Sequence, residues 1–295
     1  MKRLWQLIQN RRFVQVLATV FSNPFLQNFP KGRIHQGGSK SFCVPGLNCY
    51  SCPAAAGSCP IGALQSVLAD RKFSFSYYVA GIMILFGVLF GRLICGFLCP
   101  FGFFQDLLYK IPTPKLHIAE KVDRPLRYLK YLILAVFVIL LPLLLTDAFG
   151  SGTPYFCKWI CPAGTLEGGI PLLLENESLR AMAGVLFDWK VLLLLVTVIG
   201  SVFVYRPFCK YICPLGAFYA LFNKISFYRL KIDDVRCTGC KTCEKQCKMN
   251  VAVTKNINSA ECIRCGDCIT ACPEKAITSN LPLKKEEFTV PLAEE

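Results

Sequence analysis

The chain has 295 residues, of which 54% are hydrophobic and 18% charged, and its net charge is +14. This balance is too apolar for an ordinary soluble protein. A positive charge is compatible with nucleic acid, an acidic protein or a membrane surface, but no nucleic-acid-binding motif is present and the basic residues cluster beside apolar stretches. We therefore expect a membrane protein whose basic residues face anionic headgroups, with no nucleic-acid partner.

The first apolar stretch, residues 13–29, follows a basic N-terminus. Asn23 and Pro24 dilute its second half, and the pair Arg11 and Arg12 resembles the start of a twin-arginine export signal. No small-residue cleavage site follows, so an uncleaved anchor is the favoured interpretation.

Three stronger apolar stretches are residues 75–94, 128–146 and 189–205. Each approaches the length of about 20 residues at which a helix crosses a hydrocarbon core about 30 Å thick. A buried helix of a soluble protein is the alternative for any one of them, but three in one chain, flanked by Lys and Arg, favour the membrane. The predicted fold is mainly α, with a four-helix transmembrane bundle over residues 1–226.

The distribution of charge predicts the topology. Loop 95–127 is rich in Lys and Arg, whereas loop 147–188 carries more acidic than basic residues. The positive-inside rule then places loop 95–127 and both termini in the cytoplasm, and loops 30–74 and 147–188 outside. The basic residues of loop 30–74 conflict with this topology, but the remaining segments favour it.

The chain has 18 cysteines, many of them in C-x2-C and C-x3-C spacings, which favour metal ligation over a disulfide scaffold. A Cys-Pro-x-Gly step occurs four times, at Cys59, Cys99, Cys161 and Cys213. Set against the spans, the chain runs from an outer motif through a membrane helix to an inner motif, and does so twice. We expect two pseudo-repeated units.

Two of these steps belong to a C-x3-C-P motif at the inner end of a predicted span. Thiolates one helical turn apart make half a cluster site, and two halves brought together by helix packing supply the four ligands of a [4Fe–4S] cluster. The proline ends the helix after the second ligand, and the glycine permits a close approach of backbone N–H groups to sulfur. The predicted ligands of this inner membrane cluster are Cys95, Cys99, Cys209 and Cys213.

Six cysteines fall on the predicted outer side, which is two more than one cluster requires. The repeat favours four of them as ligands of an outer cluster, namely Cys157, Cys161, Cys52 and Cys59. Cys43 and Cys49 remain as alternative ligands or as a disulfide, which an oxidising compartment permits. Buried thiols or disulfides throughout are the alternative to a cluster here.

Beyond residue 226 two runs of the form C-x2-C-x2-C-x3-C follow, which is the pattern of bacterial two-cluster ferredoxins. In that pattern the fourth cysteine of each run binds the other cluster. The first predicted ligand set is Cys237, Cys240, Cys243 and Cys272, and the second is Cys262, Cys265, Cys268 and Cys247. Zinc is the alternative, although zinc ribbons use two C-x2-C pairs. We expect a small α+β two-[4Fe–4S] ferredoxin domain over residues 227–280 and a flexible tail over residues 281–295.

Predicted spans, C-x3-C-P motifs and a C-terminal two-cluster ferredoxin together resemble the membrane polyferredoxins, which include the quinol-oxidising membrane subunit of periplasmic nitrate reductase systems. The resemblance covers about residues 75–280. It implies a multi-pass protein of a prokaryotic cytoplasmic membrane that relays electrons between a cytoplasmic donor or the quinone pool and a partner complex. The inner motif of that family maps onto Cys95, Cys99, Cys209 and Cys213. The outer cysteines lie outside that subunit's pattern, which suggests a relative with one more cluster.

The leading hypothesis is a membrane electron carrier with cytoplasmic and outer redox partners, two ferredoxin clusters, and an inner and an outer membrane cluster. Its difficulty is distance, since clusters at opposite faces of a core about 30 Å thick are too far apart for fast transfer unless they sink inward or a quinone lies between them. The alternatives are an iron–sulfur redox sensor or maturation factor, and a quinol dehydrogenase subunit for which Gln105, Asp106 and Lys110 are weak quinone-site candidates. The sequence specifies no oligomeric state.

Overall fold

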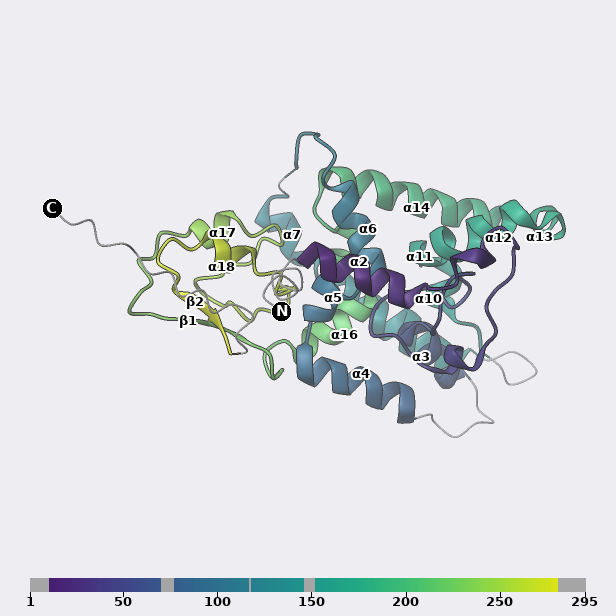
Figure 1. Ribbon diagram of the computed structural model, residues 1–295, viewed down its shortest axis with the longest axis horizontal. Helices are drawn as coiled ribbons and strands as arrows, with labels where there is room; N and C mark the ends of the chain where they lie inside the picture. Colours follow the sequence, from purple (N-terminus) through teal and green to yellow (C-terminus); the bar gives the residue numbers. More distant parts are fainter. Residues whose placement is uncertain (1–10, 70–76, 117, 146–151, 281–295) are drawn as a thin grey trace.

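The computed structural model describes residues 11–69, 77–116, 118–145 and 152–280, and these are mainly helical (Figure 1). The first half contains α2 (Arg11–Ser22), η1 (Leu26–Asn28), η2 (Gly38–Ser41), α3 (Pro60–Ala69), α4 (Tyr77–Phe90), α5 (Leu93–Phe97), α6 (Pro100–Leu108), α7 (Glu120–Leu126), α8 (Leu129–Ile133), η3 (Leu134–Leu140) and α9 (Leu141–Leu144). The second half contains α10 (Tyr155–Trp159), α11 (Pro162–Gly164), η4 (Thr165–Gly169), α12 (Ile170–Glu175), α13 (Glu177–Ala181), α14 (Val185–Phe203), α15 (Pro207–Tyr211), α16 (Pro214–Phe222), β1 (Leu230–Ile232), α17 (Thr242–Lys245), α18 (Asp267–Ala271) and β2 (Ile277–Ser279).

Two helices are long and apolar enough to cross a membrane. They are Glu120–Leu144, a continuous helix of 25 residues that contains α7 to α9, and α14, which has 19 residues. The most apolar stretch of 18 residues has a mean hydropathy of 2.0 in the first helix and 2.1 in the second. The predicted spans 128–146 and 189–205 fall on these helices, except that residue 146 lies outside the described residues. Both match the length of about 20 residues that a hydrocarbon core requires.

The other two predicted spans are shorter helices in the described residues. The helix expected over 75–94 is described from Tyr77 and ends at Phe90, because Gly91 adopts a left-handed φ of +54°. The N-terminal helix expected over 13–29 ends at Ser22, directly before Asn23 and Pro24, and its 12 described residues pack against α5 and α6. The described part of the chain therefore holds two helices of spanning length where four were expected.

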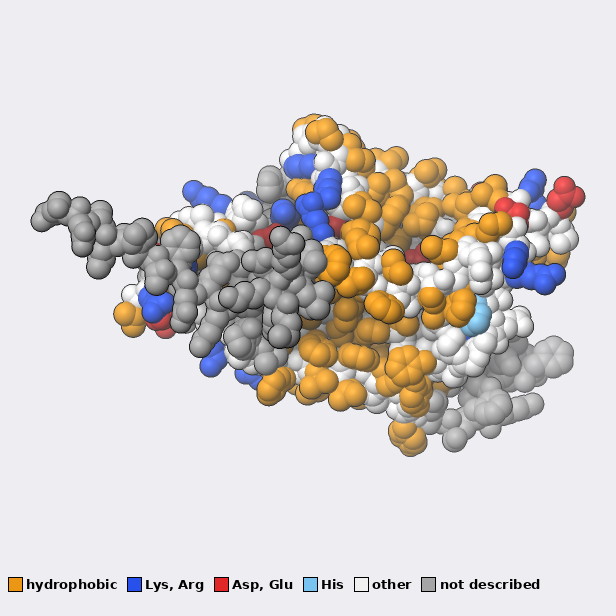
Figure 2. All heavy atoms as spheres, viewed as in Figure 1, with side chains coloured by type: hydrophobic (Ala, Val, Ile, Leu, Met, Phe, Trp, Pro, Cys, Tyr) orange, Lys and Arg blue, Asp and Glu red, His pale blue; other side chains and the backbone are white. Residues whose placement is uncertain are grey.

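Hydrophobic side chains form a broad surface band over the helical part. In Figure 2 the orange side chains cover the middle of the molecule, and blue and red side chains gather towards its two ends. The band includes exposed residues of α4 and α14 such as Leu85, Val196 and Ile199. An apolar surface of this extent requires an apolar environment or a partner, so it supports membrane association.

The cysteine-rich C-terminal region lies at one end of the helical part (Figure 1). Its beginning and end meet in an antiparallel strand pair, in which Leu230 of β1 lies opposite Ser279 of β2 and Ile232 opposite Ile277. The short helices α17 and α18 pack against each other between the two strands in sequence. Pairing of the two ends encloses both cysteine runs in one small ferredoxin-like unit.

A buried ion cluster attaches this region to the helical part. Glu261 accepts hydrogen bonds from Lys130 at 2.6 Å and from Arg92 at 3.0 Å, and both cationic side chains are fully buried. Arg264 donates to the carbonyl of Phe90, the last residue of α4, at 3.0 Å. Asn223, the residue after α16, donates to the Cys262 carbonyl at 2.8 Å. The ferredoxin-like region is therefore held against the end of α4 and the end of α16.

A second buried ion cluster fixes α2 and α15 to α6. Asp106 accepts hydrogen bonds from Arg206 through both carboxylate oxygens at 2.6 Å and from Arg11 at 2.6 Å. Burial alone would raise the pKa of this carboxyl, but the two guanidinium groups lower it to about 2. Asp106 thus stays ionised and balances cations that would otherwise be buried without a partner.

Replacement of Glu261 by Gln should destabilise the attachment of the ferredoxin-like region. The variant leaves the charges of Arg92 and Lys130 buried without a carboxylate, which costs about 3–5 kcal/mol. A clear drop in the thermal unfolding midpoint in detergent is expected. The matched control, Asp233→Asn, removes an ion pair with Arg236 whose side chains are 45% and 66% exposed, and should change the stability by less than about 1 kcal/mol. Equal small effects of both variants would contradict this role of Glu261.

Candidate iron–sulfur centres

The first ferredoxin ligand set surrounds a small cavity. Its lining includes all four predicted ligands, Cys237, Cys240, Cys243 and Cys272. Cys240 is exposed, and hydrogen bonds from the side chain and backbone of Thr242 lower its thiol pKa. A cavity lined by four thiols, one of which is exposed, fits an iron–sulfur cluster bound near the surface of the ferredoxin-like region.

The second ferredoxin set brings Cys247 of the first run to the three leading cysteines of the second run. Burial, followed by the neighbouring Cys262, Cys265 and Cys247, raises the pKa of Cys268. Cys247 thus lies beside the second run, where the exchange of the fourth cysteines would place it, and the ligand sets themselves stay a prediction. Unlike the first set, this one faces the helical part, since the carbonyl of Cys262 accepts the Asn223 amide.

The inner set gathers the two C-x3-C-P motifs. Cys95, Cys99, Cys209 and Cys213 are all buried, with at most 7% of each residue exposed. Burial, followed by the neighbouring Cys209 and Cys95, raises the pKa of Cys99 to about 12, and Cys213 lies within electrostatic range of the other three thiols. Helix packing therefore joins two half-sites more than 100 residues apart in the sequence.

The Cys-Pro-x-Gly step forms the same cap in both motifs. Cys99 and Cys213 are the N-cap residues of α6 and α16, and the proline that follows is the first residue of each helix. Each cap sulfur accepts the N–H of the glycine three residues later at 3.4 Å. The preceding helices end at Phe97 and Tyr211, two residues before the second cysteine, so the proline starts a new helix and does not end the old one as expected. The N-terminus of the new helix points its N–H groups at the sulfur.

Two arginines connect the motifs reciprocally. Arg92, three residues before Cys95, donates to the carbonyl of Cys209 at 3.2 Å. Arg206, three residues before Cys209, donates to the carbonyl of Cys95. This exchange was not expected from the sequence. The matched spacing R-x2-C-x3-C-P, present in both copies, was the signal for it.

The outer set differs from the expected one. Cys59, Cys157 and Cys161 lie within electrostatic range of one another, as the repeat predicted, and the fourth thiol near them is Cys49. Burial, followed by Glu167 and neighbouring thiols that include Cys157, raises the pKa of Cys49 to about 12. Glu167 also holds Cys49 in place by accepting its backbone N–H at 2.6 Å.

The two remaining cysteines are not among the neighbours of Cys59 and Cys161, although Cys52 lies beside Cys49, whose carbonyl accepts its N–H at 3.1 Å. Cys52 is buried against Ala54 and Ala55, and its thiol points to the Asn23 amide oxygen at 3.6 Å. Cys43 lies 3.5 Å from the hydroxyl of Ser58. The structure thus favours Cys49 over Cys52 as the fourth outer ligand. The structure contains no disulfide between the described cysteines, and the disulfide alternative for Cys43 and Cys49 stays a prediction.

The inner and outer sets lie close together, contrary to the expectation from the topology. Gly46, in the loop that carries Cys43 and Cys49, packs directly on the inner motif, where a Cβ at this glycine would come within 2.9 Å of the Cys99 Cα atom. The buried Tyr219 donates to the Pro45 carbonyl at 3.0 Å and lies within electrostatic range of Cys99 and Cys59. The loop that carries the outer cysteines therefore packs against the inner motif.

The donor sets suit clusters better than single ions. Within the described residues, no three His, Cys, Asp or Glu side chains converge closely enough to hold one metal ion. Zinc binds sulfur at about 2.3 Å and so requires such convergence, whereas a cubane spreads its thiolates around an inorganic core. Thiols grouped in fours on a helical body and a two-run region define an iron–sulfur protein of the ferredoxin type.

Comparison with known proteins agrees with this class. Residues 73–119, 131–171 and 189–232 match a family model described as a 4Fe-4S binding domain, and residues 255–278 match a second 4Fe-4S binding domain model. The uncharacterized protein MJ0750 of Methanocaldococcus jannaschii is 30% identical over 214 residues, which are 69% of this chain and 78% of that protein. The chain belongs to this polyferredoxin family, as its motifs predicted.

Named relatives are more distant. The putative electron transport protein YccM of Escherichia coli is 27% identical over 64% of this chain and 51% of its own length. The ferredoxin-type protein NapH of Haemophilus influenzae is 28% identical over 66% of this chain and 65% of its own length. No solved structure matches the chain.

Serine variants test the inner set. Cys95→Ser and Cys213→Ser should each abolish the same cluster signal in electron paramagnetic resonance (EPR) spectra, because the two thiols belong to one site although they come from different motifs. Cys272→Ser is the control, and it should alter a ferredoxin signal while the inner signal remains. Loss of different signals in Cys95→Ser and Cys213→Ser would refute the pairing.

A second pair of variants tests the outer set. Cys49→Ser should remove about 4 Fe per chain and the outer cluster signal, whereas Cys52→Ser should retain both. Iron analysis and EPR of anaerobically purified protein measure the difference. The reverse result, with iron lost only in Cys52→Ser, would restore the ligand set expected from the repeat.

Proposed function

We propose that this chain is a multi-pass membrane electron carrier. It relays electrons between a cytoplasmic donor or the quinone pool and a redox partner in or beyond the membrane. In this proposal residues 1–226 form the membrane part, with four spans in two pseudo-repeated units, and residues 227–280 form a cytoplasmic ferredoxin domain. The [4Fe–4S] clusters that the four thiol sets would hold supply one-electron transfer when bound.

The observation that carries the proposal is the continuous series of thiol sets. The ferredoxin-like region touches the inner motif directly, since a Cβ at Gly96 would come within 2.6 Å of the Ile263 carbonyl oxygen. At the other side of the inner motif, Gly46 and Tyr219 join it to the outer set. Close backbone contacts therefore join the inner motif to the ferredoxin-like region on one side and to the loop of the outer set on the other.

The exposed end of the series suits a soluble redox partner. Cys240 is exposed, and basic residues that include Arg236, Lys241 and Lys245 lie near it in the sequence. Positive charge around an exposed redox site steers an acidic partner protein and favours fast, weak encounters. The printed names of YccM and NapH, an electron transport protein and a ferredoxin-type protein, support the same role.

The sensor or maturation hypothesis receives less support. A cluster that is released or reports by decay needs an accessible site, and of the four sets only the first ferredoxin set contains an exposed cysteine. The inner four thiols are at most 7% exposed, which suits electron carriage with water excluded.

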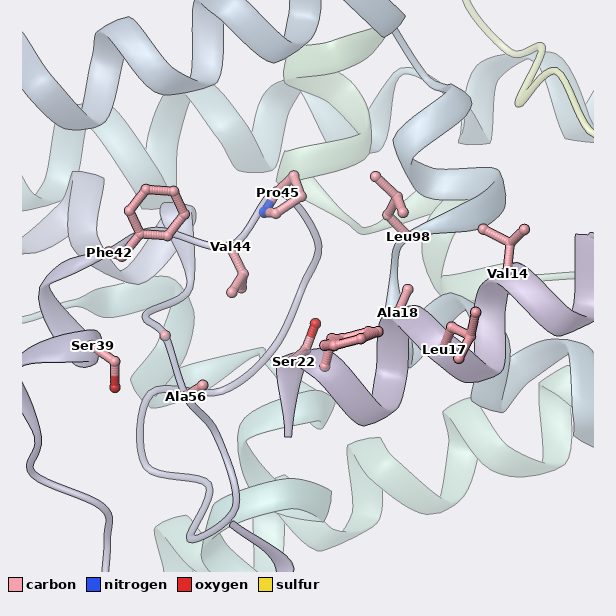
Figure 3. Close-up of a pocket in the computed structure, with 12 residues that line it drawn as sticks. Val14, Leu17, Ala18, Ser22, Ser39, Phe42, Val44, Pro45, Ala56 and Leu98 are labelled. Carbon is pink, nitrogen blue, oxygen red and sulfur yellow. The ribbon is translucent and has the colours of Figure 1, made fainter. Parts of the chain in front are cut away.

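A second candidate function is quinol oxidation, because an apolar groove of about 620 Å³ opens beside the inner set (Figure 3). Leu17 and Ala18 of α2 form one wall and Val44 and Pro45 the other, while Leu98, the neighbour of Cys99, lies at the inner end. A groove of this kind has room for an isoprenoid quinone next to a cluster ligand. The lining of the groove includes none of the quinone-site candidates expected from the sequence, Gln105, Asp106 and Lys110. Gln105 contacts Cys209 and Asp106 is ion-paired instead.

Reconstitution tests the proposal. Anaerobically purified protein should contain about 16 Fe per chain, the content of four cubanes, and in proteoliposomes it should pass electrons from a soluble reductant on one side to an acceptor on the other. Cys213→Ser, which keeps the ferredoxin ligands, should abolish this transfer while the ferredoxin clusters still reduce. An iron content of about 8 per chain, or transfer that survives in Cys213→Ser, would overturn the proposal. The second candidate is tested in the same vesicles with quinol as the sole electron donor. Quinol should then reduce the clusters, and Leu17→Trp, which fills the groove, should block that reduction.

A further inference from the structure

The four Cys-Pro-x-Gly steps place a polar side chain at the same position, six residues after the cap cysteine. These side chains are Gln65, Gln105, Glu167 and Tyr219. In the second unit the side chain reaches backbone, as Glu167 accepts the Cys49 N–H and Tyr219 donates to the Pro45 carbonyl. In the first unit both residues are glutamines, and each reaches a cysteine sulfur of the second unit instead.

Gln105 donates to the inner set. Its amide nitrogen lies 3.1 Å from the sulfur of Cys209 and 3.4 Å from the carbonyl oxygen of Phe101, and the residue is fully buried. A carbonyl oxygen only accepts hydrogen bonds, so the contact with Phe101 requires the nitrogen, not the oxygen, on this side of the amide. The same nitrogen therefore presents an N–H group to the sulfur.

Gln65 repeats this arrangement at the outer set. Its amide nitrogen lies 3.3 Å from the sulfur of Cys157 and 3.2 Å from the carbonyl of Ile61, and the residue is also fully buried. Its amide oxygen accepts the N–H of Phe156 at 2.9 Å. A backbone N–H only donates, so this contact fixes the orientation of the amide independently, again with the nitrogen towards the sulfur.

Packing alone does not explain Gln105. The amide oxygen of Gln105 is buried and has no hydrogen-bond partner among the described residues. An unsatisfied buried acceptor destabilises the fold, and an apolar side chain of similar length would avoid that cost. The amide therefore has a use that a hydrocarbon side chain lacks, and the bond it makes is the one to Cys209.

We propose that Gln105 and Gln65 set the reduction potentials of the inner and outer membrane clusters, one residue for each cluster. This inference rests on the ligand sets of the proposed function. An N–H donated to a ligand sulfur stabilises the extra negative charge that the cluster gains when it accepts one electron, so it raises the potential. No proton moves in the step, since the amide keeps its hydrogen in both redox states. The glutamines are positioning residues, because they act through the ligand sulfur.

Two leucine variants test the inference, and each is the control for the other. Gln105→Leu should lower the midpoint potential of the inner cluster, so that its ratio of reduced to oxidised form at a fixed potential falls about tenfold, or about 59 mV for one electron, while the outer cluster is unchanged. Gln65→Leu should do the same to the outer cluster alone. EPR-monitored redox titration measures both, with the inner signal identified by its loss in Cys213→Ser and the outer by its loss in Cys161→Ser.

Iron analysis separates tuning from assembly. All variants should retain about 16 Fe per chain, and Gln105→Met, which preserves the side-chain length without a donor, should reproduce the shift of Gln105→Leu. Unchanged potentials, equal shifts of both clusters in either variant, or loss of the inner cluster in both Gln105 variants would overturn the inference. Failure of the proposed function has a different result, since the unsubstituted protein would then hold only about 8 Fe per chain.

Discussion

The structure depends on the buried guanidinium of Arg92. This side chain, which is fully buried, donates to Glu261 of the ferredoxin-like region and to the Cys209 carbonyl of the second unit, while its own chain leads into Cys95. Three parts of the sequence thus meet at one cation. An arginine suits this role because its planar, always charged group offers five donors in a fixed geometry, and because Glu261 supplies the charge that burial requires. The inner thiol set lies where these contacts converge.

Duplication of the chain explains how the same Cys-Pro-x-Gly helix cap occurs at two thiol sets. A cysteine that caps a helix receives N–H groups from the helix terminus, and the proline after it fixes the direction in which the helix starts. The repeat is complete at the inner set, where each motif contributes two thiols. At the outer set the first unit has only Cys59, since Ala55 stands where the matching cysteine would be. Cys49 replaces it from a loop, and Glu167 of the repeat holds that loop in place.

Residues 43–59 pack on the inner motif, and this contact changes the functional interpretation. Electron transfer between clusters requires short separations, and a loop exposed on the far side of the membrane would not provide them. Gly46 packs on Cys99 without a side chain in between, and Tyr219 bridges the loop and the inner set. The same loop forms a wall of the apolar groove, so the inner set, the outer set and the groove share one neighbourhood.

The sequence by itself determined what depends on near neighbours in the chain. Cysteine spacing predicted the ferredoxin groupings and the pairing of two C-x3-C-P motifs, and apolar length predicted the helices Glu120–Leu144 and Val185–Phe203. Only the tertiary structure decided that Cys49 lies beside Cys59 and Cys161, that Arg92 and Arg206 each bond to the opposite motif, and that the cysteine loop packs on the inner motif. The physical reason is the separation along the chain between the residues that come into contact. A helical turn fixes which thiols lie together within a motif, whereas the approach of a loop thiol or a long arginine depends on packing between segments far apart in the chain.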